Sequence, residues 1–414
     1  MERKQSCRKI ELLAPAGDLY RCKTAIRFGA DAVYIGGQQF SLRSRASNFT
    51  LQDIREACAF AREYGSRIHV TVNIIPHEED YDGLAEYLKE LEDAGVTAII
   101  VASPAIMDIA RKSAPGLEIH CSTQMSVTNA EAAAYLSDTL GIDRVVLARE
   151  CTMEDVRAIT ASCPVETEAF IHGGMCVNYS GRCTLSNKMT LRDANRGGCA
   201  QSCRWYYHLY HNEEELTREE LFTMGSKDLC AAEYIYDFIE AGVSSLKIEG
   251  RMKSEYYVAS IVSAYRNLID EIEETGTRLG EERMQYHLRQ ILRGENRQTY
   301  PGFYPGRAGR ESLILHQNSD LDVNHDFLGV VKQYRDGVMT LECRNVISEQ
   351  EMIEVLAPGK LQKEFPVEWI RDENQEYMSS CRKPMTRIQI PVPFEVHEND
   401  IIRRSYHDRR KDQR

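Results

Sequence analysis

Apolar and polar positions alternate in blocks along the first two thirds of the chain. Short β-branched, apolar runs are each followed by a loop and an amphipathic stretch, and several of these stretches end in a glycine, as helices do. The runs occupy residues 10–13, 32–35, 68–74, 98–101, 117–121, 144–147, 165–171 and 245–248. Strands that alternate with helices pair in parallel, and eight of them close a barrel. The pattern therefore predicts an α/β fold, a TIM-like (β/α)8 barrel over residues 1–298.

The seventh and eighth predicted strands are unusually far apart. Their first residues, 165 and 245, are separated by 80 positions, whereas the other strands start mostly 20–36 residues apart. The surplus indicates a cysteine-rich insertion at about residues 173–244. Active sites of such barrels lie at the carboxyl ends of the strands, so an insertion that leaves strand seven should overhang that face.

From about residue 327 the apolar pattern changes to a period of two, which is typical of strands that are buried on one side. Turn residues stand at Arg335–Gly337 between two such runs. We expect a small antiparallel β-barrel domain over residues 327–405, after a linker rich in Gly, Pro and Tyr at 299–326. Residues 406–414 form a basic tail.

Composition narrows the cellular setting. The chain has a net charge of −12 and lacks both a signal-peptide pattern and the ~20-residue apolar run that a membrane helix needs. We therefore expect a cytoplasmic protein that does not enter a membrane. Its 13 cysteines are an odd number, and clustered thiols in a reducing compartment indicate metal or redox chemistry more often than disulfides.

Five of the cysteines fall within 55 residues, inside the predicted insertion. The first four follow the spacing C-x6-C-x15-C-x3-C, and the fifth comes 27 residues later; they are Cys176, Cys183, Cys199, Cys203 and Cys230. Neither pair has the C-x2-C spacing of most structural zinc sites, whereas an all-cysteine [4Fe–4S] site tolerates unequal gaps. The spacing favours an iron–sulfur cluster and leaves zinc or ordinary thiols as alternatives.

The residues around the first two cysteines resemble a known signature. Glu168-x-Phe170-x2-Gly173, then Cys176, then Gly181-x-Cys183-x-Leu185-Ser186 is similar to the pattern of peptidase family U32, the collagenase-like proteins. Further agreeing motifs follow one another in the same order at residues 11–18, 30–37, 195–205, 226–229 and 246–251. One departure is Gly174, where the family has Ser or Ala, and a small residue still fits there.

This resemblance implies more than proteolysis. The family includes oxygen-independent hydroxylation proteins that act on tRNA, ribosomal RNA or ubiquinone precursors, and several carry a [4Fe–4S] cluster. The length and domain order are most similar to the tRNA-hydroxylating subgroup, in which prephenate is implicated in forming 5-hydroxyuridine at the wobble position. The resemblance implies that Cys176, Cys183, Cys199 and Cys203 hold the cluster. Cys230 is then more simply a buried thiol.

Polar residues at the ends of predicted strands complete a candidate site. Those expected to contact a small substrate are Arg251, Arg149, Arg45, Gln124 and Asn73. If the ligand is a dicarboxylate such as prephenate, the three arginines can each offer a two-point guanidinium fork. Candidates for proton transfer or other catalytic roles are Glu249, Glu168, Lys247 and His172. Each of these could instead be a satisfied group at the barrel rim.

RNA binding needs positive charge, and the chain as a whole is acidic. Residues 176–204 are different, because five basic residues face one acidic residue, Asp193, for a local net charge of +4. The basic residues are Arg182, Lys188, Arg192, Arg196 and Arg204. Aromatic residues that could stack on bases are nearby at Tyr179 and 205–207. This segment predicts a tRNA-binding surface, with a merely solvated loop as the alternative.

Two other functions remain open. A peptidase is one, although the chain has neither G-x-S-x-G nor H-E-x-x-H, and nothing marks His172 and Cys176 as a catalytic pair. A non-catalytic RNA-binding protein with a structural iron–sulfur cluster is the other. Partners expected from the resemblance are tRNA, prephenate and a second subunit, either an identical one or a related family member.

Overall fold

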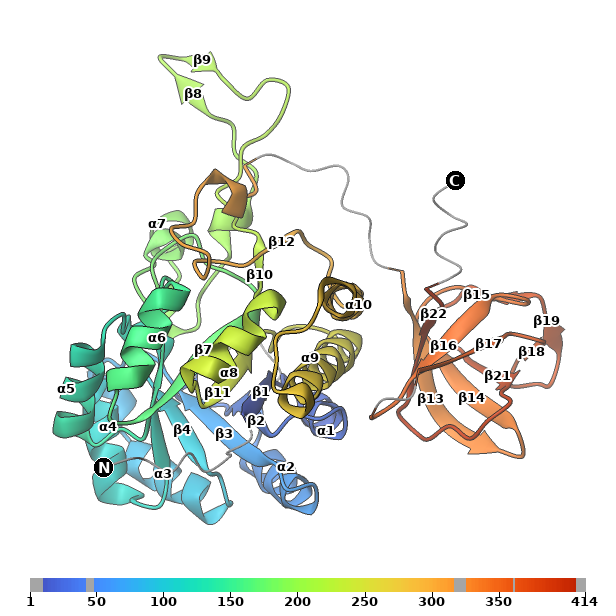
Figure 1. Ribbon diagram of the computed structural model, residues 1–414, viewed down its shortest axis with the longest axis horizontal. Coiled ribbons are helices and arrows are strands. Elements are labelled where there is room, and N and C mark those ends of the chain that lie inside the picture. The colour runs from blue at the N-terminus through green and yellow to red at the C-terminus, as the bar shows by residue number, and fades with distance from the viewer. Residues whose placement is uncertain (1–9, 42–47, 316–324, 360–361, 407–414) are drawn as a thin grey trace.

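The computed structural model describes residues 10–41, 48–315, 325–359 and 362–406 (Figure 1). Eight parallel strands form a closed barrel within them, in chain order around the ring, and the last strand pairs with both the seventh and the first. They are β1 (Glu11–Pro15), β2 (Ala32–Gly36), β3 (Arg67–Val72), β4 (Ala98–Val101), β5 (Glu118–Cys121), β6 (Arg144–Val146), β7 (Glu166–Gly173) and β11 (Ser245–Ile248). The predicted eight-stranded barrel is confirmed.

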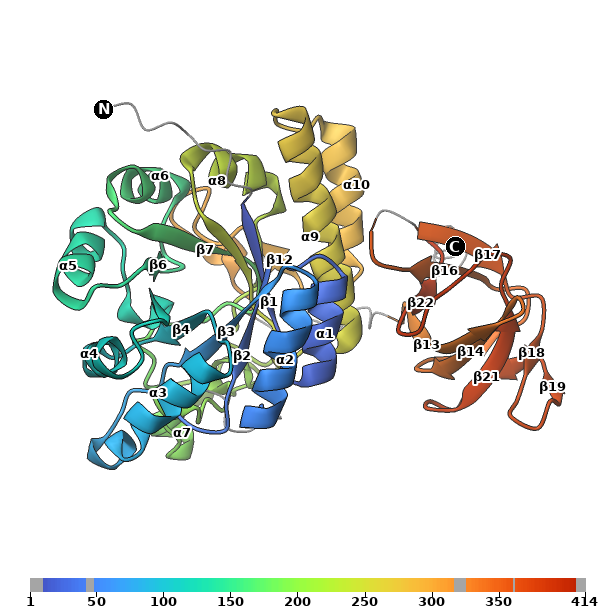
Figure 2. The same ribbon diagram turned by 90° about the horizontal axis from the view of Figure 1, so that it is seen from below.

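Helices surround the strands, as Figure 2 shows. They are α1 (Leu19–Arg27), α2 (Leu51–Glu63), α3 (Leu84–Asp93), α4 (Pro104–Ser113), α5 (Ala130–Leu140), α6 (Met153–Ser162), α8 (Ile235–Ala241) and α9 (Glu255–Thr275), with α10 (Glu281–Leu292) packed on α9. Local sequence fixes their starts. Thr50 and Thr152 each form a capping box with an aspartate three residues later, which satisfies backbone N–H groups at the starts of α2 and α6.

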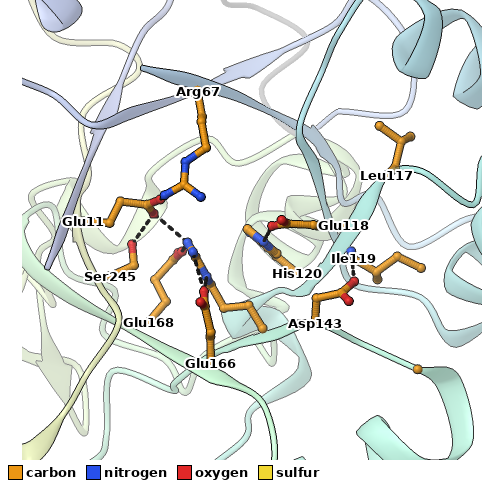
Figure 3. A network of polar contacts seen from close by, with 12 residues as sticks. Glu11, Arg67, Leu117, Glu118, Ile119, His120, Asp143, Glu166, Glu168 and Ser245 are labelled. Carbon is orange, nitrogen blue, oxygen red and sulfur yellow. Dashed lines mark hydrogen bonds and ion pairs between the residues drawn. The ribbon is translucent and has the colours of Figure 1, made fainter. Parts of the chain in front are cut away.

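Charged side chains cluster inside the barrel near the amino-terminal ends of its strands, which we call the lower end (Figure 3). Arg144 donates to Glu11 at 2.6 Å and to Glu168 at 3.1 Å, and it is 1% exposed. Glu166 at 2.7 Å and Arg67, which donates to Glu11, complete the network. A buried charge is tolerated only when it is paired, and here each of these five charges has an opposite partner.

An insertion separates β7 from α8. It holds the short helix α7 (Leu185–Thr190), a hairpin of β8 (Tyr210–His211) and β9 (Glu214–Glu215), and β10 (Asp228–Cys230). The hairpin projects away from the barrel (Figure 1). Strand β10 returns to the barrel, where it pairs antiparallel with the end of β7 and parallel with β12 (Thr299–Tyr300).

The C-terminal region has its own apolar core and an antiparallel sheet. Its strands, in sheet order, are β17 (Gln362–Pro366), β16 (Met352–Leu356), β22 (Ile401–Arg404), β13 (Phe327–Arg335), β14 (Val338–Cys343), β21 (Arg387–Pro391), β18 (Ile370–Arg371) and β19 (Tyr377–Met378). A separate pair joins β15 (Ile347–Ser348) to β20 (Ser380–Cys381). The antiparallel pairing predicted here is confirmed. The predicted basic tail falls outside the described residues from position 407 onward.

Buried ion pairs join this sheet to the barrel. Arg293, just after α10, donates to Asp326 at 3.0 Å and to Glu354 on β16 at 2.9 Å. Glu354 also accepts from Arg403 of β22 at 3.0 Å. These groups are almost fully buried, and apolar residues of the sheet, Val330, Leu356 and Ile401, belong to the same core cluster as the barrel, so the contact is both polar and apolar.

Candidate active site at the barrel mouth

A cavity of about 270 Å³ lies between the barrel mouth and residues 175–204, which we call the cysteine segment. The barrel contributes Tyr34, Thr71, Asn73, Gln124, Arg149, Phe170, Lys247, Glu249 and Arg251 to its lining, among others. The cysteine segment contributes Cys176, Cys183, Cys199 and Cys203. These barrel residues stand at the carboxyl ends of the strands, where active sites of this fold occur.

The four cysteines share one electrostatic environment. Burial raises the pKa of the Cys176 thiol, and Cys199 and Cys183 raise it further, while Arg149 acts in the opposite direction. Burial raises the pKa of Cys203 and Cys176 raises it further, Arg204 lowers it, and Cys199 and Cys183 add smaller increases. Thiols that hinder one another's ionisation lie close together, and a bound cation would reverse this effect by stabilising the thiolates. Nevertheless, no three Cys, His, Asp or Glu side chains of the described chain are arranged to hold a single metal ion as they stand.

Glycines let the cysteine segment approach the barrel rim closely. Gly173 has φ +101°, and a β-carbon there would lie 2.3 Å from the carbonyl oxygen of Glu249. Gly181 has φ +72°, and its β-carbon would lie 2.0 Å from the carbonyl oxygen of Gln124. Both positions exclude side chains on grounds of space and of backbone conformation. Gly173 and Gly181, on either side of Cys176, therefore allow the segment to lie directly against the barrel mouth.

Arg251 is built into the rim at a second pair of glycines. A β-carbon at Gly36 would lie 1.7 Å from its Nη2 atom, and one at Gly17 would lie 2.2 Å from its carbonyl oxygen. The guanidinium, which is almost fully buried, donates to the hydroxyls of Ser41 and Thr71, both at 3.2 Å. It also donates to Asn48 Oδ1 at 3.2 Å. Arg251 thus lines the cavity while its position is fixed by neutral acceptors.

Arg149 differs from Arg251 in its contacts. Its guanidinium carbon lies 3.9 Å from the centre of the Phe170 ring, and within the described residues it has no carboxylate partner. Its backbone N–H donates to Ser180 Oγ at 3.4 Å, next to the cysteine segment's Gly181. An arginine that stacks on an aromatic ring beside a cavity is suited to bind an anion. Arg45, the third predicted arginine, lies outside the described residues.

Lys247 and Glu168 form a buried pair beneath the cavity. Lys247 Nζ lies 2.7 Å from Glu168 Oε1 and 4.7 Å from the centre of the Tyr34 ring. Burial lowers the pKa of Lys247. Burial alone would raise the pKa of Glu168, but Lys247 and Arg144 hold it at about 2. Lys247 borders the cavity whereas Glu168 does not, so Glu168 acts on a ligand only through Lys247.

Two amides and one carboxylate complete the rim. Asn73 Nδ2 donates to Gln124 Oε1 at 2.8 Å, and both side chains border the cavity. Glu249 borders it as well, and its carbonyl oxygen accepts a hydrogen bond from Tyr257 at 2.8 Å. The structure therefore brings together, around one cavity, six of the residues predicted from the strand ends: Asn73, Gln124, Arg149, Lys247, Glu249 and Arg251.

His172, predicted as catalytic, lies elsewhere. The pairing of β7 with β11 shifts register by one residue before Ile248, and this irregularity turns His172 away from the interior. Its ring contacts Glu295 at 2.6 Å and the hydroxyl of Tyr265 at 3.1 Å. Burial alone would lower its pKa, but Glu295 raises the pKa of His172 to about 9. It is a buried, ion-paired group that does not border the cavity.

The predicted RNA-binding residues divide into two groups. Arg196 forms an ion pair with Asp80, and Arg204 forms one with Asp228 at 2.9 Å. The other three have no carboxylate partner in the described part of the chain; they are Arg182, Lys188 and Arg192. Ion pairing therefore reduces the positive charge that this segment offers to a phosphate backbone.

Comparison with known proteins identifies the family. A model of "Peptidase family U32" matches residues 17–313, and a model of "Peptidase family U32 C-terminal domain" matches residues 323–403. The chain belongs to peptidase family U32. The family match covers both the barrel with its mouth and the C-terminal sheet.

Several U32 relatives have names that refer to RNA. The chain is 42% identical to "tRNA hydroxylation protein P1" of Bacillus subtilis over 96% of its length and 95% of that protein. It is 41% identical to "23S rRNA 5-hydroxycytidine C2501 synthase" of Escherichia coli over 66% of its length and 41% of that protein. Another relative, 35% identical over 95% of this chain and 97% of its own, is named "Collagenase", from Porphyromonas gingivalis.

No helix among the described residues is long and apolar enough to cross a membrane.

Proposed function

We propose that this chain hydroxylates RNA, with 5-hydroxyuridine at the wobble position of tRNA as its product. The observation that carries the proposal is the shared cavity, where four cysteines face the polar end of the barrel. The similarity to a tRNA hydroxylation protein along nearly the whole chain supports the same function. Replacing the C5–H bond of uracil by a C–OH bond is a two-electron oxidation, so the reaction needs a co-substrate that supplies the hydroxyl oxygen and an acceptor for two electrons.

The four cysteines would hold a [4Fe–4S] cluster. They are thiols on an irregular, glycine-rich segment, they line one cavity, and they are electrostatically coupled. A cluster is larger than one metal ion, so its thiolates stand further apart than the ligands of a zinc site. When bound, such a cluster can exchange electrons or polarise an oxygen as a Lewis acid. Asn178 Nδ2, 3.2 Å from Cys183 Sγ, can donate a hydrogen bond to that thiolate.

The barrel side of the cavity would bind the co-substrate, for which prephenate is our candidate. Arg149 and Arg251 can each bind one carboxylate of a dicarboxylate, and Arg149 has the charge more readily available. Lys247 below them and Glu249 beside them are the groups that can hold or move a proton. Asn73 and Gln124 offer neutral hydrogen-bonding groups to the remaining polar atoms.

RNA would approach from the side of the cysteine segment. Arg182, Lys188 and Arg192 supply cations there, and three aromatic side chains with substantial exposure lie in the same segment or just after it: Tyr179, Trp205 and Tyr206. Bases stack on such rings while cations contact phosphates. The combination suits a single-stranded loop such as an anticodon.

The peptidase alternative has one arrangement in its favour, because Cys230, His172 and Glu295 are adjacent. Both imidazole nitrogens are engaged, however, one with Glu295 and the other with Tyr265. Burial alone would lower the pKa of His172, but Glu295 and Cys230 raise it, so the imidazole is held as a buried, ion-paired group. None of the three residues borders the mouth cavity. This arrangement does not support peptide hydrolysis.

Mass spectrometry of tRNA nucleosides tests the proposal. Cells without the gene should lack 5-hydroxyuridine, and the wild-type gene should restore it. The Cys176→Ala variant should fail to restore it and should lack iron when purified anaerobically, whereas Cys343→Ala, a buried cysteine of the C-terminal sheet, should behave as wild type. Unchanged 5-hydroxyuridine in the deletion strain would exclude this function, and stoichiometric zinc in colourless anaerobic protein would exclude the cluster.

A further inference from the structure

One guanidinium joins the two ends of the cysteine segment. Arg204 directly follows Cys203, and its Nη2 atom lies 3.2 Å from the carbonyl oxygen of Met175, which directly precedes Cys176. The same Nη2 atom donates to Asp228 Oδ1 at 2.9 Å. The side chain is 16% exposed, so little of it faces solvent. Arg204 therefore spans 29 residues of chain and contacts the backbone next to two of the four cysteines.

Asp228 anchors this contact to the barrel. It is fully buried and begins β10, whose next residue, Leu229, pairs with Gly173 at the end of β7. Its backbone N–H donates to the carbonyl oxygen of Gln298 at 3.0 Å. The backbone of Asp228 is thus held in place independently of the cysteine segment.

Further charges extend the network into the barrel wall. Lys253 Nζ lies 3.6 Å from Asp228 and 3.8 Å from Glu295, and Glu295 contacts His172. Arg297 also lies 3.6 Å from Asp228. Acidic and basic groups therefore alternate from His172 to Arg204, and a buried carboxylate surrounded by three cations has a strongly preferred position.

Gly174 and Gly225 lie next to the Arg204 side chain. A β-carbon at Gly174 would make an ordinary van der Waals contact of 3.9 Å with Arg204 Nη2, and one at Gly225 would lie 3.9 Å from its Cγ atom. Thr223 Oγ1 additionally donates to the carbonyl oxygen of Cys203 at 3.2 Å. Arg204 is therefore mostly buried and already hydrogen-bonded, which is typical of a structural contact and not of a side chain free to bind a phosphate.

We propose that Arg204 and Asp228 are a positioning pair that fixes Cys176 and Cys203 relative to each other and to the barrel mouth. This inference rests on the proposed function, in which both cysteines bind the cluster. Groups that hold metal ligands in place typically change metal affinity by roughly 10–100-fold when they are removed. Arg204 thus belongs to the cysteine site and not to the RNA-binding surface.

The test compares full-length Arg204→Gln, Asp228→Asn and Arg204→Lys with a matched control, Arg192→Gln. Arg192 lies in the same segment and has no carboxylate partner among the described residues. Anaerobic protein is exposed to a ferrous chelator, and the rate of iron release is measured. The Gln and Asn variants should release iron roughly tenfold faster than wild type, and the control should not. Arg204→Lys keeps one charge contact and should fall between them.

A second measurement keeps the inference independent of the cluster. In iron-free protein, diamide oxidises pairs of neighbouring thiols to disulfides, and mass spectrometry gives the fraction of Cys203 joined to Cys176. This fraction should fall severalfold in Arg204→Gln, measured at a temperature at which the variant and the wild-type protein are both fully folded. A wild-type protein without iron would contradict the proposed cluster alone. Wild-type iron release and wild-type cross-linking in the Gln and Asn variants, or weakened tRNA binding with normal iron, would overturn the positioning pair.

Discussion

The two ends of the barrel interior contain the same kinds of side chain in different states. At the lower end, Glu11, Arg144 and Glu168 are fully buried and paired with opposite charges. At the mouth, Arg149 stacks on Phe170 beside a cavity, without a carboxylate partner in the described chain. Charged residues in a barrel therefore do not by themselves mark a site. What distinguishes the mouth is a charge that faces open space.

The largest expected effect comes from removing the central cation of the buried ion-pair network at the lower end. Arg144→Met would leave the buried Glu11 and Glu168, and the partly exposed Glu166, without their shared cation, and removing one partner of a buried ion pair costs about 3–5 kcal/mol. We expect the free energy of unfolding in denaturant to fall by that amount. As a control, Arg111→Ala breaks a more exposed pair with Asp143 and should cost at most about 1 kcal/mol. Equal losses would show that burial does not separate the two pairs.

At the mouth the expected loss is in activity and not in stability. Arg149→Ala removes a cation that would bind the co-substrate, and truncating a buried charge contact costs about 2–5 kcal/mol of binding, roughly 30-fold or more. The 5-hydroxyuridine content of tRNA should fall accordingly while iron content and unfolding stay normal. Arg157→Ala, on the outer helix α6, provides the control. Normal product in the Arg149→Ala strain would remove this residue from the site.

Arg251 combines features of both ends of the barrel, because its side chain is buried and hydrogen-bonded and also lines the cavity at the mouth. Arg251→Ala should abolish the product with normal iron content, but it also loses hydrogen bonds to Ser41, Thr71 and Asn48. We therefore expect a lower free energy of unfolding as well, unlike Arg149→Ala. Arg251→Lys keeps the charge without the planar fork and should be clearly impaired. Full stability of Arg251→Ala would mean that those hydrogen bonds contribute little.

The buried pair of His172 and Glu295 predicts that the free energy of unfolding depends on pH. Folding raises the pKa of His172 from 6.5 to about 9, so the folded state binds the proton more tightly than the unfolded state. This stabilisation is fully present below pH 6.5 and is lost as the pH rises through 9, by an amount on the order of 3 kcal/mol. Denaturant unfolding across this range should show the loss, and His172→Gln should flatten it. An identical slope in the variant would assign the dependence to other groups.

The smallest effect concerns RNA. Reversing Arg182 and Arg192 to Glu should weaken tRNA binding and flatten its dependence on salt, because fewer counterions are released, roughly 0.7 per phosphate contact on single strands. Arg196→Gln is the comparison, since Arg196 is already paired with Asp80 and should change the salt slope little. Salt slopes that match wild type in the double variant would show that the segment is only solvated surface.

Local pattern was sufficient to predict the barrel but not every site residue. Each of the eight barrel strands has a short apolar run, and Lys247, Glu249 and Arg251 follow from their place on the last one. The sequence could not show that His172 lies away from the cavity, because a one-residue register shift between paired strands leaves no trace in composition. Nor could it show the ion pair of Arg196, because the partner, Asp80, is 116 residues away in sequence. Asp228 was overlooked, although it lies in a motif that the family resemblance had already singled out.

The closing strand β11 has a consequence for how the protein is made. It bridges β7 and β1, and its Ser245 bonds to Glu11, 234 residues earlier in the chain. Lys247 lies on this strand, and Glu249 and Arg251 follow it directly. During synthesis the ring therefore cannot close until these residues have left the ribosome, and long-range pairing of this kind is slow. Closure of the barrel and completion of its mouth, with Lys247, Glu249 and Arg251 in place, are therefore the same event.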